Sequence, residues 1–219
     1  MKNIPVFMSP AGTATLILQE IPRSGRAFIL LQTIVPEGLQ QLTADAKKFC
    51  QDCGAKEIFI SNAREKLPFS PAYDILILTV QKDSLPAGRP VTLQPLSQEN
   101  AELYISIYNR CFEGISHAVS YDRSQIRRIK AQDQQAFIAC SADGSPAGIG
   151  ELHGNELAAV AVLPEYRGMG KALTLSLLAL CPGPEIILTV ASDNQRALGL
   201  YEKLEFHVKE IESRWYHCP

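Results

Sequence analysis

A glycine-rich segment near the C-terminal end of the chain could bind a phosphate group. Residues 167–173 read Arg-Gly-Met-Gly-Lys-Ala-Leu and stand between two apolar runs, which predicts a strand, a turn without acidic residues, and a helix. Gly168 and Gly170 have no Cβ and let the main chain approach a ligand, and Arg167 adds a permanent positive charge. The first N–H groups of a helix lack partners and, with the helix dipole, favour an anion. The segment therefore predicts a pyrophosphate site.

The positions of these glycines exclude two common phosphate-binding motifs. A Walker A loop would need a glycine at Glu165 and a hydroxyl at Ala172. A dinucleotide-binding fingerprint would need a third glycine at Leu173. The pattern that remains is Arg-x-x-Gly-x-Ala at residues 167–172, preceded by Val-Leu-Pro-Glu-Tyr.

A second block of residues, 193–206, follows another apolar run of strand length at 185–190. Asp193 or Asn194 can cap a helix. That helix carries apolar residues at helical spacing, Ala197, Tyr201 and Leu204. Asn194 and Tyr201 are two turns apart and project from nearly the same side. Two structural alternatives stay open: Tyr201 as a core aromatic, and Asn194 as a cap alone.

The two blocks together resemble motifs of the GNAT superfamily of acyl-CoA-dependent N-acetyltransferases, over roughly residues 90–219. The second block is similar to the family pattern N-x-x-A-x-x-x-Y-x-x-x-G-F, except that Glu205 replaces the usual glycine, which puts the turn after the helix in question. The resemblance implies acetyl-CoA as co-substrate and direct transfer of the acetyl group to a primary amine of a small molecule, amino acid or peptide.

The resemblance also implies which residues hold the coenzyme. Main-chain groups of Val160, Ala161 and Val162 would bind the pantetheine arm and the thioester. The pyrophosphate would be bound by the segment Arg167, Gly168, Met169, Gly170, Lys171, Ala172 and Leu173, through the N–H groups from residue 168 onward. Asn194 would be a further coenzyme contact.

Amide formation requires a neutral amine, and a lysine-like amine with a pKa near 10.4 is almost wholly charged at pH 7, so a general base is useful. Glu156 is the first candidate, because it stands four residues before Val160, where histone-type GNAT enzymes carry a glutamate. By the two-residue period of a strand it would share a face with Val160 and Val162. The alternative is a solvated strand end.

Other residues complete the predicted chemistry. Glu151 and His117 are reserve bases, and Thr189 stands where another GNAT branch has its glutamate. Tyr201 matches the family tyrosine that protonates the leaving thiolate. The acceptor would meet residues 113–122, whose acids and aromatics suit a cationic amine.

The predicted fold class is α/β with a mixed sheet, in two domains. Residues 84–90 have linker composition, which divides the chain into a small N-terminal α/β domain at 1–85 and a GNAT domain at 90–219. From Val91 the expected order is β-α-α-β-β-β-α-β-α-β-β. The first domain should hold two strands around residues 23–25, a helix from Pro36 to about Cys53, and strands at 56–61 and 73–81. It is either a degenerate GNAT half-copy without a phosphate loop, or an unrelated module that packs on the enzyme domain or forms a homodimer.

Composition narrows the function classes. A formal net charge of −2 gives no general attraction for nucleic acid or an anionic membrane. No apolar run is long enough to cross a bilayer, and the six scattered cysteines suit a reducing compartment, so we expect the cytoplasm. Cys50 and Cys53 have metal-ligand spacing but no second pair, so we expect no metal. Two rival functions remain: a non-catalytic acyl-CoA sensor, and a nucleotide-binding regulator.

Overall fold

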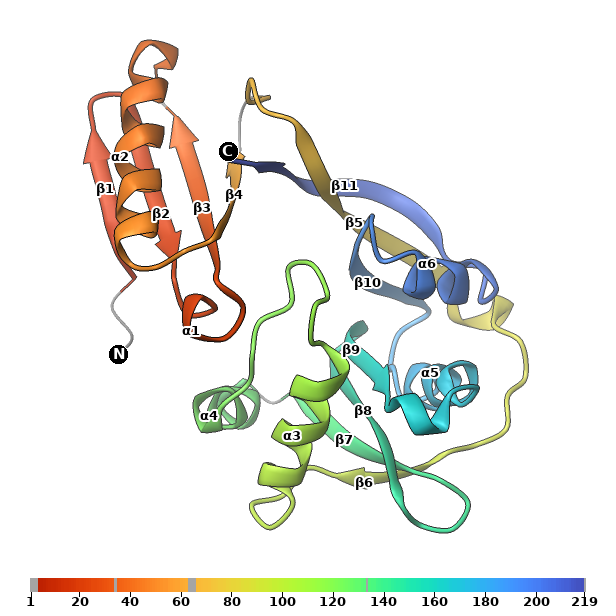
Figure 1. Ribbon diagram of the computed structural model, residues 1–219. Helices are drawn as coiled ribbons and strands as arrows, with labels where there is room; N and C mark the ends of the chain where they lie inside the picture. Colours follow the sequence, from red (N-terminus) through yellow and green to blue (C-terminus); the bar gives the residue numbers. More distant parts are fainter. Residues whose placement is uncertain (1–3, 34, 63–65, 133, 219) are drawn as a thin grey trace. The chain divides into compact units, whose positions relative to one another are not determined.

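The structure is a computed structural model of the chain, and it describes residues 4–33, 35–62, 66–132 and 134–218 (Figure 1). The fold is mixed α/β, as predicted. The chain forms two compact units: residues 1–75 with 211–219, and residues 76–210. The proposed domain boundary between residues 85 and 90 stays a prediction, but the compact units divide ten residues earlier. The last nine residues also belong to the first unit, because the strand that contains them pairs there.

The first unit is a sheet with one long helix on it. Its strands lie in the order β1-β2-β3-β4-β11, with α2 against β1, β2 and β3. Their bounds are β1 (Val6–Ser9), β2 (Gly12–Ile17), α1 (Ile21–Ser24), β3 (Arg26–Thr33), η1 (Pro36–Gly38), α2 (Leu39–Asp52) and β4 (Glu57–Asn62). The predicted helix from Pro36 to about Cys53 is confirmed as η1 and α2, and the two predicted strands on either side of residues 23–25 are confirmed as β2 and β3. Strand β1 was not predicted. Strands β5 (Pro71–Gln81) and β11 (His207–His217) contribute residues to both units.

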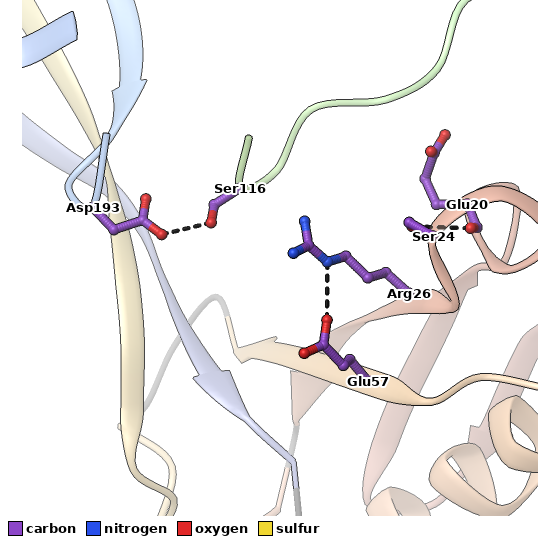
Figure 2. A network of polar contacts seen from close by, with 6 residues as sticks. All are labelled: Glu20, Ser24, Arg26, Glu57, Ser116 and Asp193. Carbon is purple, nitrogen blue, oxygen red and sulfur yellow. Dashed lines mark hydrogen bonds and ion pairs between the residues drawn. The ribbon is translucent and has the colours of Figure 1, made fainter. Parts of the chain in front are cut away.

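The parallel strands β3 and β4 are paired along most of their length, from Arg26 opposite Glu57 to Leu31 opposite Asn62. Figure 2 shows the ion pair at the start of this ladder, where Arg26 Nε donates to Glu57 Oε2 at 3.0 Å. The continuous pairing leaves no gap between these two strands.

The second unit holds both sequence motifs. Its strands β10, β9, β8, β7 and β6 are neighbours in that order. In chain order the elements are η2 (Lys82–Ser84), β6 (Thr92–Pro95), α3 (Ala101–Cys111), α4 (Arg123–Ala131), β7 (Gln135–Cys140), β8 (Pro146–His153), β9 (Glu156–Val162), η3 (Pro164–Tyr166), α5 (Gly170–Leu178), β10 (Glu185–Ala191) and α6 (Gln195–Glu202). The predicted order is confirmed up to α6. Only one strand, β11, follows it, where two were expected.

Two cores lie on opposite faces of this sheet. Tyr104 of α3 and Ile129 of α4 pack with Ile149 on one face. Leu173 and Leu177 of α5 pack with a second set of strand residues on the other. Close packing of α5 depends on Gly150 of β8, because a Cβ there would lie 2.3 Å from Leu177 Cδ1.

A β-bulge interrupts β9 at Ala158. Leu152 of β8 faces Leu157, but the preceding residue, Glu151, faces Ala159, so β9 has one residue more than β8 at this point. A bulge of this kind reverses the alternation of side chains along the strand. Accordingly Leu157 lies in the core under α5, whereas Ala159 lies in the core under α3.

Candidate acyl-CoA site

Strands β9 and β10 separate soon after they begin. Their register has one pair, Ile187 opposite Glu156, and Ile187 N–H donates to the Asn155 carbonyl at 3.0 Å. The opposite edge of β9 stays paired with β8 as far as Val162. Within the described residues, the β10-facing edge of residues 160–162 therefore borders an opening, as expected of a strand that offers main-chain groups to a ligand.

A cavity of about 660 Å³ lies at this opening. Val160, Ala161 and Val162, which the sequence predicts to bind the pantetheine arm, form one wall. The other walls come from the start of α5, from α6, and from the end of α3 with the residues that follow it. The volume is in the range typical of small-molecule and cofactor sites.

The start of α5 presents main-chain donors to the cavity. The first hydrogen bond of the helix is donated by Leu173 N–H to the Met169 carbonyl at 2.9 Å, so the N–H groups of residues 170–172 precede it. Gly168 has a φ of 107°, a backbone conformation that residues with a side chain rarely adopt, and it also lines the cavity. The segment predicted to bind the pyrophosphate is thus a turn followed by a helix N-terminus.

Two predicted donors are already used by the chain itself. Met169 N–H donates to the Tyr166 carbonyl at 3.2 Å, and Leu173 N–H is taken as described above. Leu173 is also fully buried in the core under α5. Their main-chain N–H groups are therefore not available to a phosphate in this structure, which reduces the predicted set to residues 168 and 170–172.

The charge of the cavity is positive. Lys171, Arg196 and Lys203 line it, and no acidic residue is among the described residues that do. Arg167 is exposed but is not among the lining residues. Such a lining favours an anionic ligand.

Asn194 lines the cavity and caps α6, since its side-chain oxygen accepts from Ala197 N–H at 3.2 Å. Asn194 therefore caps the helix, which is one of the two roles that the sequence predicts for it. Because the cap uses the side-chain oxygen, the amide nitrogen is the part left to face a ligand.

Tyr201 lies two turns along α6 and also lines the cavity. It is 7% exposed, and its hydroxyl forms no hydrogen bond with any residue that the structure describes. Burial raises the pKa of Tyr201 to about 12. Its hydroxyl is therefore protonated at neutral pH and can donate to an atom in the cavity.

Glu205 preserves the turn for which the family uses glycine. Its φ is 65°, and the chain leaves α6 by two hydrogen bonds, from Glu205 N–H to the Glu202 carbonyl and from Phe206 N–H to the Tyr201 carbonyl, both at 3.0 Å. This pair of bonds is the Schellman motif, which usually has glycine at this position. The turn is retained, and the glutamate adopts a left-handed conformation.

Glu156 lies differently from the prediction. The expectation that it shares a face with Val160 and Val162 is wrong, because the bulge at Ala158 reverses the alternation between them. Val160 and Val162 pack toward the core under α5, whereas Glu156, which precedes Leu157, points to the other face. Glu156 is half-buried and does not line the cavity.

Glu151, named from sequence only as a reserve, is the buried carboxylate of the α3 face. It is 3% exposed; the Tyr104 hydroxyl donates to Oε1 at 2.6 Å and the Tyr121 hydroxyl donates to Oε2 at 3.0 Å. Burial raises the pKa of Glu151 above its usual range. The two hydroxyls satisfy this carboxylate, and no sequence pattern links the three residues.

Besides the Tyr121–Glu151 bond, side-chain hydrogen bonds from Ser116 and Asn109 hold the segment predicted to meet the acceptor. The Ser116 hydroxyl donates to Asp193 Oδ2, beside Asn194 (Figure 2). Tyr121 is held by Asn109, whose side chain bonds both its N–H (2.7 Å) and its carbonyl (2.9 Å). His117, the other reserve base, lies in this segment with φ of 63° and does not line the cavity.

The separated strands, the cationic cavity and the helix N-terminus define an α/β domain whose cavity suits an anionic ligand. Residues 101–206 match the Acetyltransferase (GNAT) family, so the chain carries a GNAT acetyltransferase domain there. This match supports acyl-CoA N-acetyltransferase activity in general terms. Among curated proteins, none is similar at a significant level.

Solved structures resemble the chain over nearly its whole length. A functionally unknown conserved protein from Staphylococcus epidermidis is 16% identical with a TM-score of 0.61, over 98% of this chain and 93% of that one. A GCN5-related N-acetyltransferase from Kribbella flavida is 15% identical with a TM-score of 0.60, over 100% and 90%. A tandem GNAT protein from the clavulanic acid biosynthesis pathway is 17% identical with a TM-score of 0.55, over 97% and 80%. At these identities the likeness shows the fold.

The described residues include neither a membrane-spanning helix nor a cluster of metal-binding side chains. None of their helices has the length and apolar character needed to cross a membrane. No group of three or more His, Cys, Asp or Glu among them could hold a metal ion.

Proposed function

We propose that the second unit transfers the acetyl group of acetyl-CoA directly to a primary amine of a small molecule, amino acid or peptide. The observation that carries the proposal is the opening between β9 and β10, which leads to a cavity lined by cations and by the first residues of α5. Free main-chain groups of residues 160–162 suit a pantetheine arm, and the N–H groups of residues 168 and 170–172 suit a pyrophosphate.

Tyr201 is the proposed acid. The amine nitrogen forms a bond to the acetyl carbon, the carbon–sulfur bond breaks, and the electron pair leaves on the sulfur. The Tyr201 hydroxyl then donates its proton to that thiolate. Because burial raises the pKa of Tyr201 to about 12, above that of a thiol, its hydroxyl donates a hydrogen bond throughout the neutral range and stabilises the departing thiolate in this way; a proton that passes to the sulfur is returned to the tyrosine from water.

The base that removes the amine proton is proposed to be a carboxylate on the α3 face. Glu156 remains a candidate on this face, and it would act through water because it does not line the cavity. The raised pKa of Glu151 suits a base, but both of its carboxylate oxygens accept hydrogen bonds, from Tyr104 of α3 and from Tyr121 of the acceptor segment, so we propose that it holds that segment against α3.

Thiol release from acetyl-CoA across a panel of amines tests the proposal. The expected result is turnover with at least one amine, with kcat reduced about 10²-fold or more in Tyr201→Phe. Tyr216→Phe is the control, since Tyr216 is also a buried tyrosine but does not line the cavity. Binding of acetyl-CoA without turnover for any amine would favour the non-catalytic sensor, and equal competition by ATP and CoA would favour the nucleotide-binding regulator.

The first unit is proposed to be a degenerate half-copy of the same fold. The elements β3-η1-α2-β4 repeat the order β9-η3-α5-β10, and Pro-Glu opens both 3₁₀ turns. In the first unit the parallel strands stay paired, so the opening that would admit a coenzyme arm is closed. We also propose that the protein lies in the cytoplasm, because its six scattered cysteines suit a reducing compartment. A homodimer remains part of the proposal.

A further inference from the structure

Arg196 and Lys203 lie on one stripe of α6, with Gly199 between them. The three residues are spaced by three and four positions, which places them on the same side of the helix. All three line the cavity. Leu200, on the same stripe, faces the start of α5: its Cδ2 lies 3.7 Å from where a Cβ on Gly170 would be. The stripe therefore looks toward the predicted phosphate loop.

The two cations have no partner in the part of the chain that the structure describes. Neither forms a hydrogen bond or an ion pair with a described residue. They are about 10 Å apart along the helix axis, a span that two long side chains can close over a shared anion. Both side chains are therefore available to an anion that enters the cavity between them.

Gly199 leaves room for such an anion. A Cβ at this position would meet no atom within 4 Å, although the residue lines the cavity. Glycine weakens the interior of a helix relative to alanine. Here it keeps the surface between the two cations free of a side chain, so a phosphate can lie against the helix.

Coenzyme A offers one phosphate more than the start of α5 accounts for. The N–H groups at the start of α5, with the Lys171 side chain, suit its pyrophosphate; Gly168, Gly170 and Lys171 line the cavity, whereas Ala172 does not. The remaining anion is the phosphate on the 3′-oxygen of its adenosine. We infer that Arg196 and Lys203, across Gly199, bind this 3′-phosphate and make the protein selective for coenzyme A over dephospho-coenzyme A. The inference rests on the proposed function.

The test is calorimetric titration of the full chain with coenzyme A and with dephospho-coenzyme A, at one ionic strength. The wild type is expected to bind coenzyme A about tenfold more tightly, the effect of one or two charge-assisted contacts at an exposed site. Arg196→Ala with Lys203→Ala should bring the ratio of the two dissociation constants near one and leave the affinity for dephospho-coenzyme A nearly unchanged. Arg127→Ala, which removes an exposed cation of α4 outside the cavity, should keep the wild-type ratio.

The outcomes separate this inference from the proposed function. Equal affinity of the wild type for both ligands overturns the inference and leaves the coenzyme site standing. An unchanged ratio in the double variant, or an equal loss of the ratio in Arg127→Ala, also overturns it, the latter in favour of general charge attraction. Failure of the folded wild type to bind either ligand counts against the proposed function itself.

Discussion

Replacing Glu205 by glycine should stabilise the protein. Glu205 holds a left-handed φ of 65° in the turn after α6, and this conformation costs a residue with a Cβ about 1–2 kcal/mol. Glycine removes that cost but gives the unfolded chain more freedom, worth about 0.4–1 kcal/mol. The net gain therefore lies between about 0 and 1.6 kcal/mol, with a midpoint of about 0.8 kcal/mol, which corresponds to a rise in Tm of about 2–3 °C for a chain of this size.

The assay is thermal unfolding of three proteins followed by circular dichroism: the wild type, Glu205→Gly and Glu205→Ala. The alanine variant removes the same carboxylate but keeps the Cβ, so the difference between the two variants isolates the backbone effect. The glycine variant should melt above the alanine variant, which should remain close to the wild type because the side chain is exposed. A glycine variant that melts at or below the alanine variant refutes the reasoning, since relief of the strained turn would then not be worth more than the added freedom of the unfolded chain.

Three further substitutions test the packing and the buried charges. Gly148→Ala would place a Cβ 2.3 Å from the Ala161 carbonyl oxygen, so we expect a loss of about 1–3 kcal/mol in urea unfolding; an unchanged midpoint would show that β8 and β9 yield easily. Because burial raises the pKa of Glu151 above its ordinary 4.5, ionising it costs stability, and Glu151→Gln should gain stability relative to the wild type as the pH rises above about 4.5; a difference independent of pH would contradict this. The hydrogen bonds from Arg214 lower the pKa of Asp74 below 3.8, so Asp74→Asn should be less stable than the wild type at neutral pH, and the gap should close in acid; equal stability at pH 7 would mean that the pair contributes nothing.

The sequence predicted the local elements of the site because each is encoded by neighbouring residues. Gly168 and Gly170 mark the turn and the start of α5, and Asn194 and Tyr201 fix one side of α6. The position of Glu156 was missed for a physical reason: residues 157–162 are all apolar, so their pattern carries no alternation from which a bulge could be recognised.

Features that join distant residues could not be predicted from one sequence. Tyr104 and Tyr121 meet Glu151 only after α3 has packed on β8. The pairing of Tyr216 with Ile60, which assigns the end of β11 to the first unit, likewise depends on tertiary structure. The N–H groups of Met169 and Leu173 were predicted to bind the pyrophosphate, but local hydrogen bonds use both of them. The Met169 N–H bonds the end of the 3₁₀ turn before the helix, and the Leu173 N–H makes the first hydrogen bond of the helix.

The central claim is that main-chain N–H groups at the start of α5 hold the pyrophosphate of coenzyme A. The most direct measurement is titration of the ¹⁵N-labelled protein with coenzyme A, following the amide resonances of Gly168, Gly170, Lys171 and Ala172 by NMR. The account predicts that these amides shift to saturation with a single dissociation constant, while amides of α2 in the first unit stay unchanged. Saturable shifts confined to other segments, with these four amides unmoved, would contradict it.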